Sequence, residues 1–93
     1  MTRAELAATA AAISNAKGAP GFEEEVHGVL RPLLEGVGTV EEDRMRDLYV
    51  RRGENTGTGP TIMLDAHMDE VGFMVHSICP NGTLRFIPLG GWV

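Results

Sequence analysis

The sequence predicts an α/β fold, in which two N-terminal helices are followed by a mixed β-sheet that ends in a hairpin. Three observations predict it. Apolar residues recur at helical spacing up to about residue 37. From residue 39 the pattern changes to the alternation that is typical of strands. Further on, Pro80-Asn81-Gly82 separates two apolar runs, which is a strong hairpin signal. With 93 residues, the chain is one domain or part of one.

The first helix is predicted to begin at Thr2, because Thr2 and Glu5 have the spacing of a capping box. The alanine-rich run behind them favours a helix, and Gly18 with Pro20 ends it. A second helix is predicted to start near residue 22, with three glutamates in its first turn. Pro32 predicts a kink or an early end. One buried face is expected to comprise Phe22, Val26, Val29, Leu30, Leu33 and Val37.

Four or five strands follow in this interpretation. They are expected at 39–42, 45–52, 61–66, 71–78 and 83–87. The apolar run at 61–66 is typical of a central, buried strand. Residues 53–60 are small and polar, and they predict a flexible loop.

Composition excludes several classes of function. The net charge of −5 and the lack of a basic face argue against nucleic-acid binding. Cys79 is the single cysteine, so no internal disulfide can form, and a reducing, cytoplasmic location is expected. No stretch approaches the roughly 20 apolar residues of a membrane span.

His67 and Asp69 carry the clearest chemistry. In an extended segment, residues i and i+2 point to the same side. His67 can therefore bind a divalent metal through one ring nitrogen while the Asp69 carboxylate orients the ring through the other. From spacing alone, an ordinary hydrogen-bonded pair is favoured over a metal site. Glu70 is read as a structural or interface carboxylate, and Asp65 shares the parity of the pair and could support it. Two further histidines, His27 and His76, are read as surface or partly buried residues rather than ligands.

The context of this pair closely resembles the glutamyl/deblocking aminopeptidase family. The resemblance is carried by residues 62–75, by Asn81-Gly82-Thr83-Leu84-Arg85-Phe86 and by Leu89-Gly90-Gly91-Trp92. Residues 18–23 also look like the early loop of the family. These proteins are dinuclear metallopeptidases that include the tetrahedral aminopeptidases, and some members carry an endoglucanase label.

The resemblance implies a function, cofactors and partners. His67 would be the first metal-binding histidine, and Asp69 the carboxylate that orients it. The full enzyme would hold two divalent ions (Zn²⁺, Co²⁺ or Mn²⁺), take a peptide substrate and form a homo-oligomer. Residues 1–93 would be the N-terminal part of a zinc-peptidase-like, three-layer catalytic domain, with 88–93 starting the connection to a dimerisation domain. The implied reaction is release of an N-terminal residue from a peptide, with no role for nucleic acid or membrane.

Two departures from the family limit this expectation. Asp43-Arg44-Met45-Arg46-Asp47 stands where the family has an Asp-x-x-Gly-Asn-like turn, so a permissive glycine is replaced. The other metal ligands and the catalytic glutamate of the family lie beyond Trp92. The chain by itself is therefore expected to be inactive. Two alternatives are a small metal-binding protein and a non-catalytic module that binds itself or a partner. The second is suggested by the apolar residues after residue 85.

Overall fold

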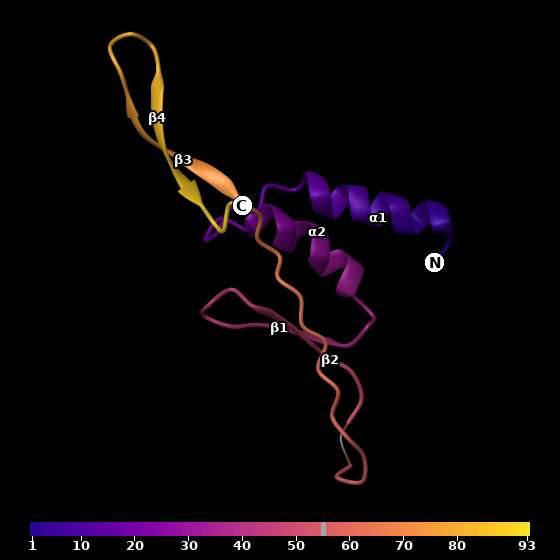
Figure 1. Cartoon of the computed structure of the whole chain (residues 1–93). Helices are drawn as coiled ribbons and strands as arrows, with labels where there is room; N and C mark the ends of the chain where they lie inside the picture. Colours follow the sequence, from indigo (N-terminus) through magenta and orange to yellow (C-terminus); the bar gives the residue numbers. More distant parts are fainter. Residues whose placement is uncertain (55) are drawn as a thin grey trace.

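The computed structural model describes residues 1–54 and 56–93 of the chain. Two helices come first and four strands follow (Figure 1). The elements are α1 (Arg3–Asn15), α2 (Glu24–Leu34), β1 (Thr39–Glu42), β2 (Leu48–Arg51), β3 (Gly72–Ile78) and β4 (Leu84–Leu89). The helices lie side by side, the β1–β2 hairpin lies beneath α2, and the β3–β4 hairpin projects away from both (Figure 1). The predicted α/β class is confirmed.

Helix α1 begins as predicted, with a complete capping box. The Thr2 hydroxyl accepts the Glu5 backbone N–H at 3.2 Å, and the Glu5 carboxylate accepts the Thr2 N–H at 2.6 Å. The backbone hydrogen bond from Thr2 holds the pKa of Glu5 below its usual range, because it favours the charged carboxylate. The Glu5 half of the capping box therefore persists at neutral pH, and its contribution is lost as the pH falls through that lowered pKa.

Helix α2 ends at Leu34, two residues after Pro32, which agrees with the predicted early end. Its predicted buried face is only partly covered. Val26 is buried with 2% of its surface exposed, whereas Phe22 is 63% exposed. The expectation of one continuous buried face was wrong, because no element of the described residues packs over both ends of this stripe.

The predicted mixed sheet does not form. The four strands make two separate antiparallel hairpins, β1–β2 and β3–β4. In the first, Val40 lies opposite Val50, and in the second Val75 lies opposite Phe86 with a register shift at the next residue. Both hairpins are built from neighbouring segments, and a mixed sheet would need a parallel, long-range pairing to join them. The layered catalytic domain stays a prediction.

The expected central strand at 61–66 was also wrong. No strand forms over residues 61–71, all of which the structure describes. The segment is extended, and its apolar side chains are open to solvent: Ile62 is 80% and Leu64 94% exposed. An apolar run becomes a central strand only when partner strands satisfy both of its edges, and the described residues provide none. Residue 55, inside the predicted loop of 53–60, lies outside the described residues.

The molecule is extended. Its radius of gyration is 18.0 Å, against about 12 Å for a compact domain of this length. Its accessible surface is 8022 Å², which is about 2,800 Å² more than a compact protein of this mass exposes. The described residues include no helix that is both long and apolar enough to cross a membrane. The local elements are thus formed, while most apolar side chains lack a cover.

Candidate functional site

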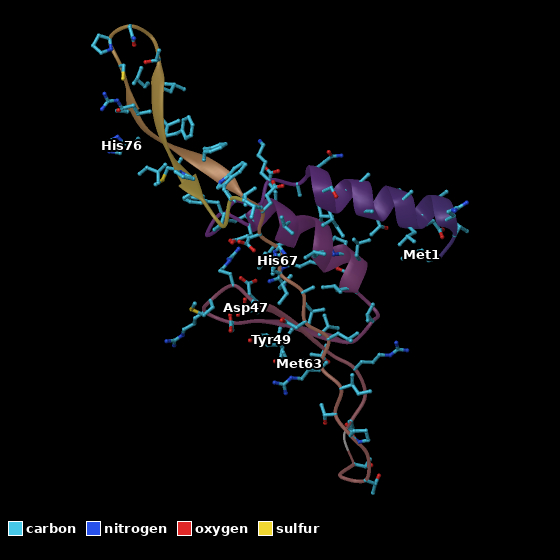
Figure 2. The ribbon with its side chains drawn as sticks, viewed as in Figure 1. Met1, Asp47, Tyr49, Met63, His67 and His76 are labelled. Atoms are coloured by element: carbon cyan, nitrogen blue, oxygen red, sulfur yellow. The ribbon has the colours of Figure 1, made fainter. Side chains whose placement is uncertain are left out.

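The candidate site is the pair formed by His67 and Asp69, in the extended segment that leads into β3. Figure 2 labels His67 in this segment. The Nδ1 atom of His67 lies 3.0 Å from Oδ1 of Asp69 and 3.0 Å from the Asp69 carbonyl oxygen. Both oxygens can only accept, so Nδ1 carries the proton and donates it. This tautomer leaves the Nε2 lone pair free. The His67 side chain is 86% exposed, and its ring is therefore open to a ligand.

The pair is positioned by two hydrogen bonds of the residues that follow Asp69. The Glu70 N–H donates to the Gly18 carbonyl at 2.7 Å, which attaches the segment to the loop between α1 and α2. Two residues further on, the Gly72 carbonyl accepts the Trp92 indole N–H at 3.2 Å. Asp69 directly precedes these two anchors and is half-buried. The predicted same-side contact of residues 67 and 69 is therefore made without a strand.

A wide groove of about 1450 Å³ runs beside the pair. It lies between the apolar face of α2, strand β2 and the extended segment that includes Ile62 and His67. The pKa of Tyr49 on β2 is raised, first by the negative charges of Asp43 and Asp47 and, more weakly, by burial, by a hydrogen bond and by Asp65. The extended segment therefore lies close enough to β2 for Asp65 to act on Tyr49.

The described residues do not assemble a complete metal site. Among them, no group of three or more His, Cys, Asp or Glu side chains could hold an ion together. His76 lies on β3, far from His67 in Figure 2. His27 is buried in α2 with 4% of its surface exposed, more deeply than the expected partly buried residue. The pair by itself can orient one imidazole toward a ligand.

The turn that departs from the family retains the geometry a glycine would give. Arg46 has a φ of +72°, in the left-handed region that favours glycine. Oδ1 of Asp43 accepts the N–H groups of Met45 at 2.9 Å and Asp47 at 3.0 Å. The Arg46 guanidinium also lies 3.0 Å from the carboxylate of Glu42. The hydrogen bonds and the ion pair thus hold a non-glycine residue in this conformation.

Glu42 is a structural centre that sequence reasoning missed. Its carboxylate pairs with Arg31 of α2 and with Arg46, and it lies 3.8 Å from Nδ1 of His27. Neither ring nitrogen of His27 has a hydrogen-bond partner among the described residues. This cluster joins α2 to the β1–β2 hairpin that borders the groove. The sequence gives one signal for this role: Glu42 is a charged residue at the second inward-facing position of the strand at 39–42.

An imidazole with one nitrogen held by a carboxylate and the other free is the arrangement that metal-dependent hydrolases use to present a ligand. Comparisons with known proteins indicate the family of the chain. Residues 48–93 match the model of the M42 glutamyl aminopeptidase family. The chain is 40% identical over 82 residues to the glutamyl aminopeptidase of Lactococcus lactis subsp. cremoris, covering 87% of this chain and 23% of that protein. It is 38% identical over 81 residues to the putative aminopeptidase FrvX of Escherichia coli, covering 86% and 22%.

A shorter match, 49% identical over 35 residues, is to the lysyl aminopeptidase of Pyrococcus furiosus, covering 38% of this chain and 10% of that protein. The chain belongs to the M42 glutamyl aminopeptidase family, and it matches the N-terminal part of these relatives. The family predicted from the sequence is therefore confirmed. The chain spans less than a quarter of the length of the curated relatives it matches. No solved structure matches the chain significantly.

Proposed function

We propose that this chain supplies one ligand corner of a divalent-metal-dependent aminopeptidase, with His67 as the metal ligand and Asp69 as the carboxylate that orients it. The observation that carries the proposal is the 3.0 Å contact between His67 Nδ1 and Asp69 Oδ1. It fixes the proton on Nδ1 and leaves Nε2 to bind an ion. Relatives named as aminopeptidases support the hydrolase class, and the family is one of metallopeptidases.

The residues present fit one ligand position rather than a whole metal centre. Catalytic zinc sites usually combine three protein ligands with a water molecule, and the described residues bring no third ligand to His67. When bound in a complete site, divalent ions polarise a scissile carbonyl and lower the pKa of a bound water. His67 and Asp69 contribute orientation of the ligand and retention of the Nδ1 proton. The 93 residues alone are therefore proposed to be inactive.

A zinc titration tests the ligand role. The wild-type chain should bind Zn²⁺ weakly in isothermal titration, and His67→Ala should remove most of the heat. His76→Ala is the matched control, because His76 is also an exposed histidine but lies on the β3–β4 hairpin. Equal loss of heat in both variants would show unspecific binding and contradict the proposal.

An activity assay tests the claim of inactivity. Leucine-, glutamate- and lysine-anilides are incubated with the chain and either Zn²⁺ or Co²⁺, and no release above the buffer rate is expected. Turnover that disappears in His67→Ala but persists in His76→Ala would show that the chain is a complete catalyst. That result would overturn the claim of inactivity and keep the ligand role.

A second candidate function is self-association, and a specific observation favours it. The β3–β4 hairpin and the residues after it carry an exposed aromatic cluster, in which the ring of Phe73 lies 4.5 Å from those of Phe86 and Trp92. An isolated two-stranded hairpin is marginal in water, and large exposed apolar patches commonly mark interaction sites. We propose that this cluster associates with a second copy when the chain is alone.

Light scattering at increasing protein concentration tests this association. The measured mass should rise toward that of a dimer, and Phe73→Ser should return it to a monomer. Leu6→Ser is the control, because Leu6 is an equally exposed apolar residue on α1. A wild-type chain that stays monomeric at high concentration would end this proposal.

A further inference from the structure

Gly18 lies in the loop between α1 and α2, and it is buried. The loop meets the residues that flank Asp69 on both sides. The Gly18 carbonyl accepts the Glu70 N–H at 2.7 Å. The point where a Gly18 side chain would begin lies 3.2 Å from the Met68 carbonyl oxygen. One loop residue is therefore hydrogen-bonded to the residue immediately after Asp69, and it lies beside the carbonyl of the residue immediately before Asp69.

These two contacts bear on the candidate site because Asp69 makes two contacts with His67. Both its carboxylate oxygen and its carbonyl oxygen lie 3.0 Å from Nδ1. A backbone that is bonded at residue 70 and closely packed at residue 68 restricts where both oxygens can lie. His67 itself is exposed, so its orientation depends on this contact rather than on packing.

We propose that Gly18 is a positioning residue for the His67–Asp69 pair, because its lack of a side chain lets the loop hold the backbone of residues 68–70. This inference rests on the proposed function only where it treats His67 as a metal ligand. The positioning itself is a statement about hydrogen bonding, and it can be tested without any metal.

The requirement at this position is for space rather than for an unusual backbone conformation. Gly18 does not have a left-handed φ, so alanine could adopt its backbone angles. A Cβ atom there would lie 2.8 Å from Cγ2 of Val26, the buried core residue of α2, and 3.2 Å from the Met68 carbonyl. Real Cβ atoms essentially never come within 3.0 Å of another heavy atom. Alanine therefore forces the Gly18 loop or Val26 to shift, and the Met68 carbonyl must give by a few tenths of an ångström, so the packing of the loop against residues 68–70 is disturbed.

The experiment measures the tautomer of His67 from the nitrogen chemical shifts of its ring, above the pH at which the ring is protonated. In the wild-type chain the Nδ1–H form should dominate. In Gly18→Ala the ratio of Nδ1–H to Nε2–H should fall about three- to tenfold, because a hydrogen bond to a charged acceptor is weakened. Circular dichroism should show that both helices remain.

Two control variants separate positioning from a general loss of stability. Gly28→Ala adds the same methyl group at a helical position with nothing within 4 Å, and it should leave the ratio unchanged. Val26→Ala loosens the core beside Gly18 without approaching Met68. It should lower the unfolding temperature and leave the ratio within experimental error. A shift in Val26→Ala as large as that in Gly18→Ala would overturn the positioning role.

A wild-type measurement keeps the inference testable if Gly18→Ala does not fold. The Glu70 amide should exchange with solvent at least tenfold more slowly than the neighbouring Val71 amide, because only the Glu70 N–H is bound to the Gly18 carbonyl. Equal exchange at both residues would overturn the inference, and so would an unchanged tautomer ratio in a folded Gly18→Ala chain. A chain that shows the expected tautomers but no zinc binding at His67 would refute only the proposed function.

Discussion

Replacing Arg46 with glycine should test how the β1–β2 turn is held. Arg46 is the only non-glycine residue with a positive φ among residues 1–54 and 56–93. For an L-residue the left-handed conformation costs about 1–2 kcal/mol. The structure offsets that cost through the two N–H groups bound to Asp43 and through the ion pair with Glu42. Arg46→Gly removes the conformational cost and the ion pair, and it keeps both hydrogen bonds.

The magnitude follows from three terms. Relief of the left-handed strain contributes about 1–2 kcal/mol. Loss of the ion pair, whose Arg46 side chain is about half exposed, costs at most about 1 kcal/mol. Glycine also adds freedom to the unfolded chain, which costs roughly 0.5–1 kcal/mol. Arg44 lies two residues earlier and has no positive φ. Arg44→Gly therefore adds the same freedom to the unfolded chain but relieves no left-handed strain. Arg46→Gly should therefore be about 1 kcal/mol more stable than Arg44→Gly.

Urea unfolding followed by circular dichroism gives this difference from the two midpoints. High salt screens the ion pair, so it should lower the stability of the wild-type chain slightly more than that of Arg46→Gly, which keeps only the other surface ion pairs. Equal midpoints for the two glycine variants, or a lower midpoint for Arg46→Gly, would refute the idea that strain at Arg46 is what glycine relieves.

Further predictions concern packing and charge. Gly28→Ala should raise the stability of α2 by about 1 kcal/mol. Gly38→Ala should destabilise the β1–β2 hairpin by about 1–3 kcal/mol, because a Cβ atom at residue 38 would lie 2.3 Å from a β2 carbonyl oxygen. Thermal melts that rank the two variants the other way would contradict this packing of Gly38 against β2. Ultraviolet titration of Tyr49, the single tyrosine, should give a pKa above its ordinary value of 10.0. Asp43→Asn should lower that pKa more than Asp65→Asn, because Asp43 has the largest effect; no change with either variant would disprove the placement of the aspartates. Because folding disfavours the tyrosinate, stability should fall as the pH rises through the ordinary value toward the raised one.

The sequence predicted the elements whose causes are local. Thr2 and Glu5 set the start of α1, and Asn81-Gly82 sets the β3–β4 turn, where the Asn81 side chain accepts the Thr83 N–H at 3.2 Å. Pro32 limits α2 in the same way. Each depends on residues a few positions apart, so the pattern contains the needed information.

The parts that depend on distant partners could not be predicted in the same way. Ile62 and Leu64 have the composition of a buried strand, yet a strand needs neighbours for its backbone groups, and composition does not say whether those neighbours are present. The convergence of Arg31 and Arg46 on Glu42 likewise needs α2 and the first hairpin to pack together.

In the candidate site, too, the local feature could be predicted from the sequence and the long-range feature could not. The spacing of His67 and Asp69 predicted their contact, and the structure makes it at 3.0 Å. The role of Gly18 could not be read from the pattern, because Gly18 lies about fifty residues before the segment it supports. The metal-binding role of His67 stays a prediction.

The most direct test of the central claim is the broadening of histidine ring signals by Mn²⁺ in nuclear magnetic resonance. If Asp69 holds the Nδ1 proton and leaves Nε2 of His67 to bind metal, His67 should broaden at a several-fold lower Mn²⁺ concentration than the exposed His76. Asp69→Asn should remove most of that preference, because an amide no longer supplies the charge that orients the ring. Equal broadening of His67 and His76 in the wild-type chain would contradict the claim.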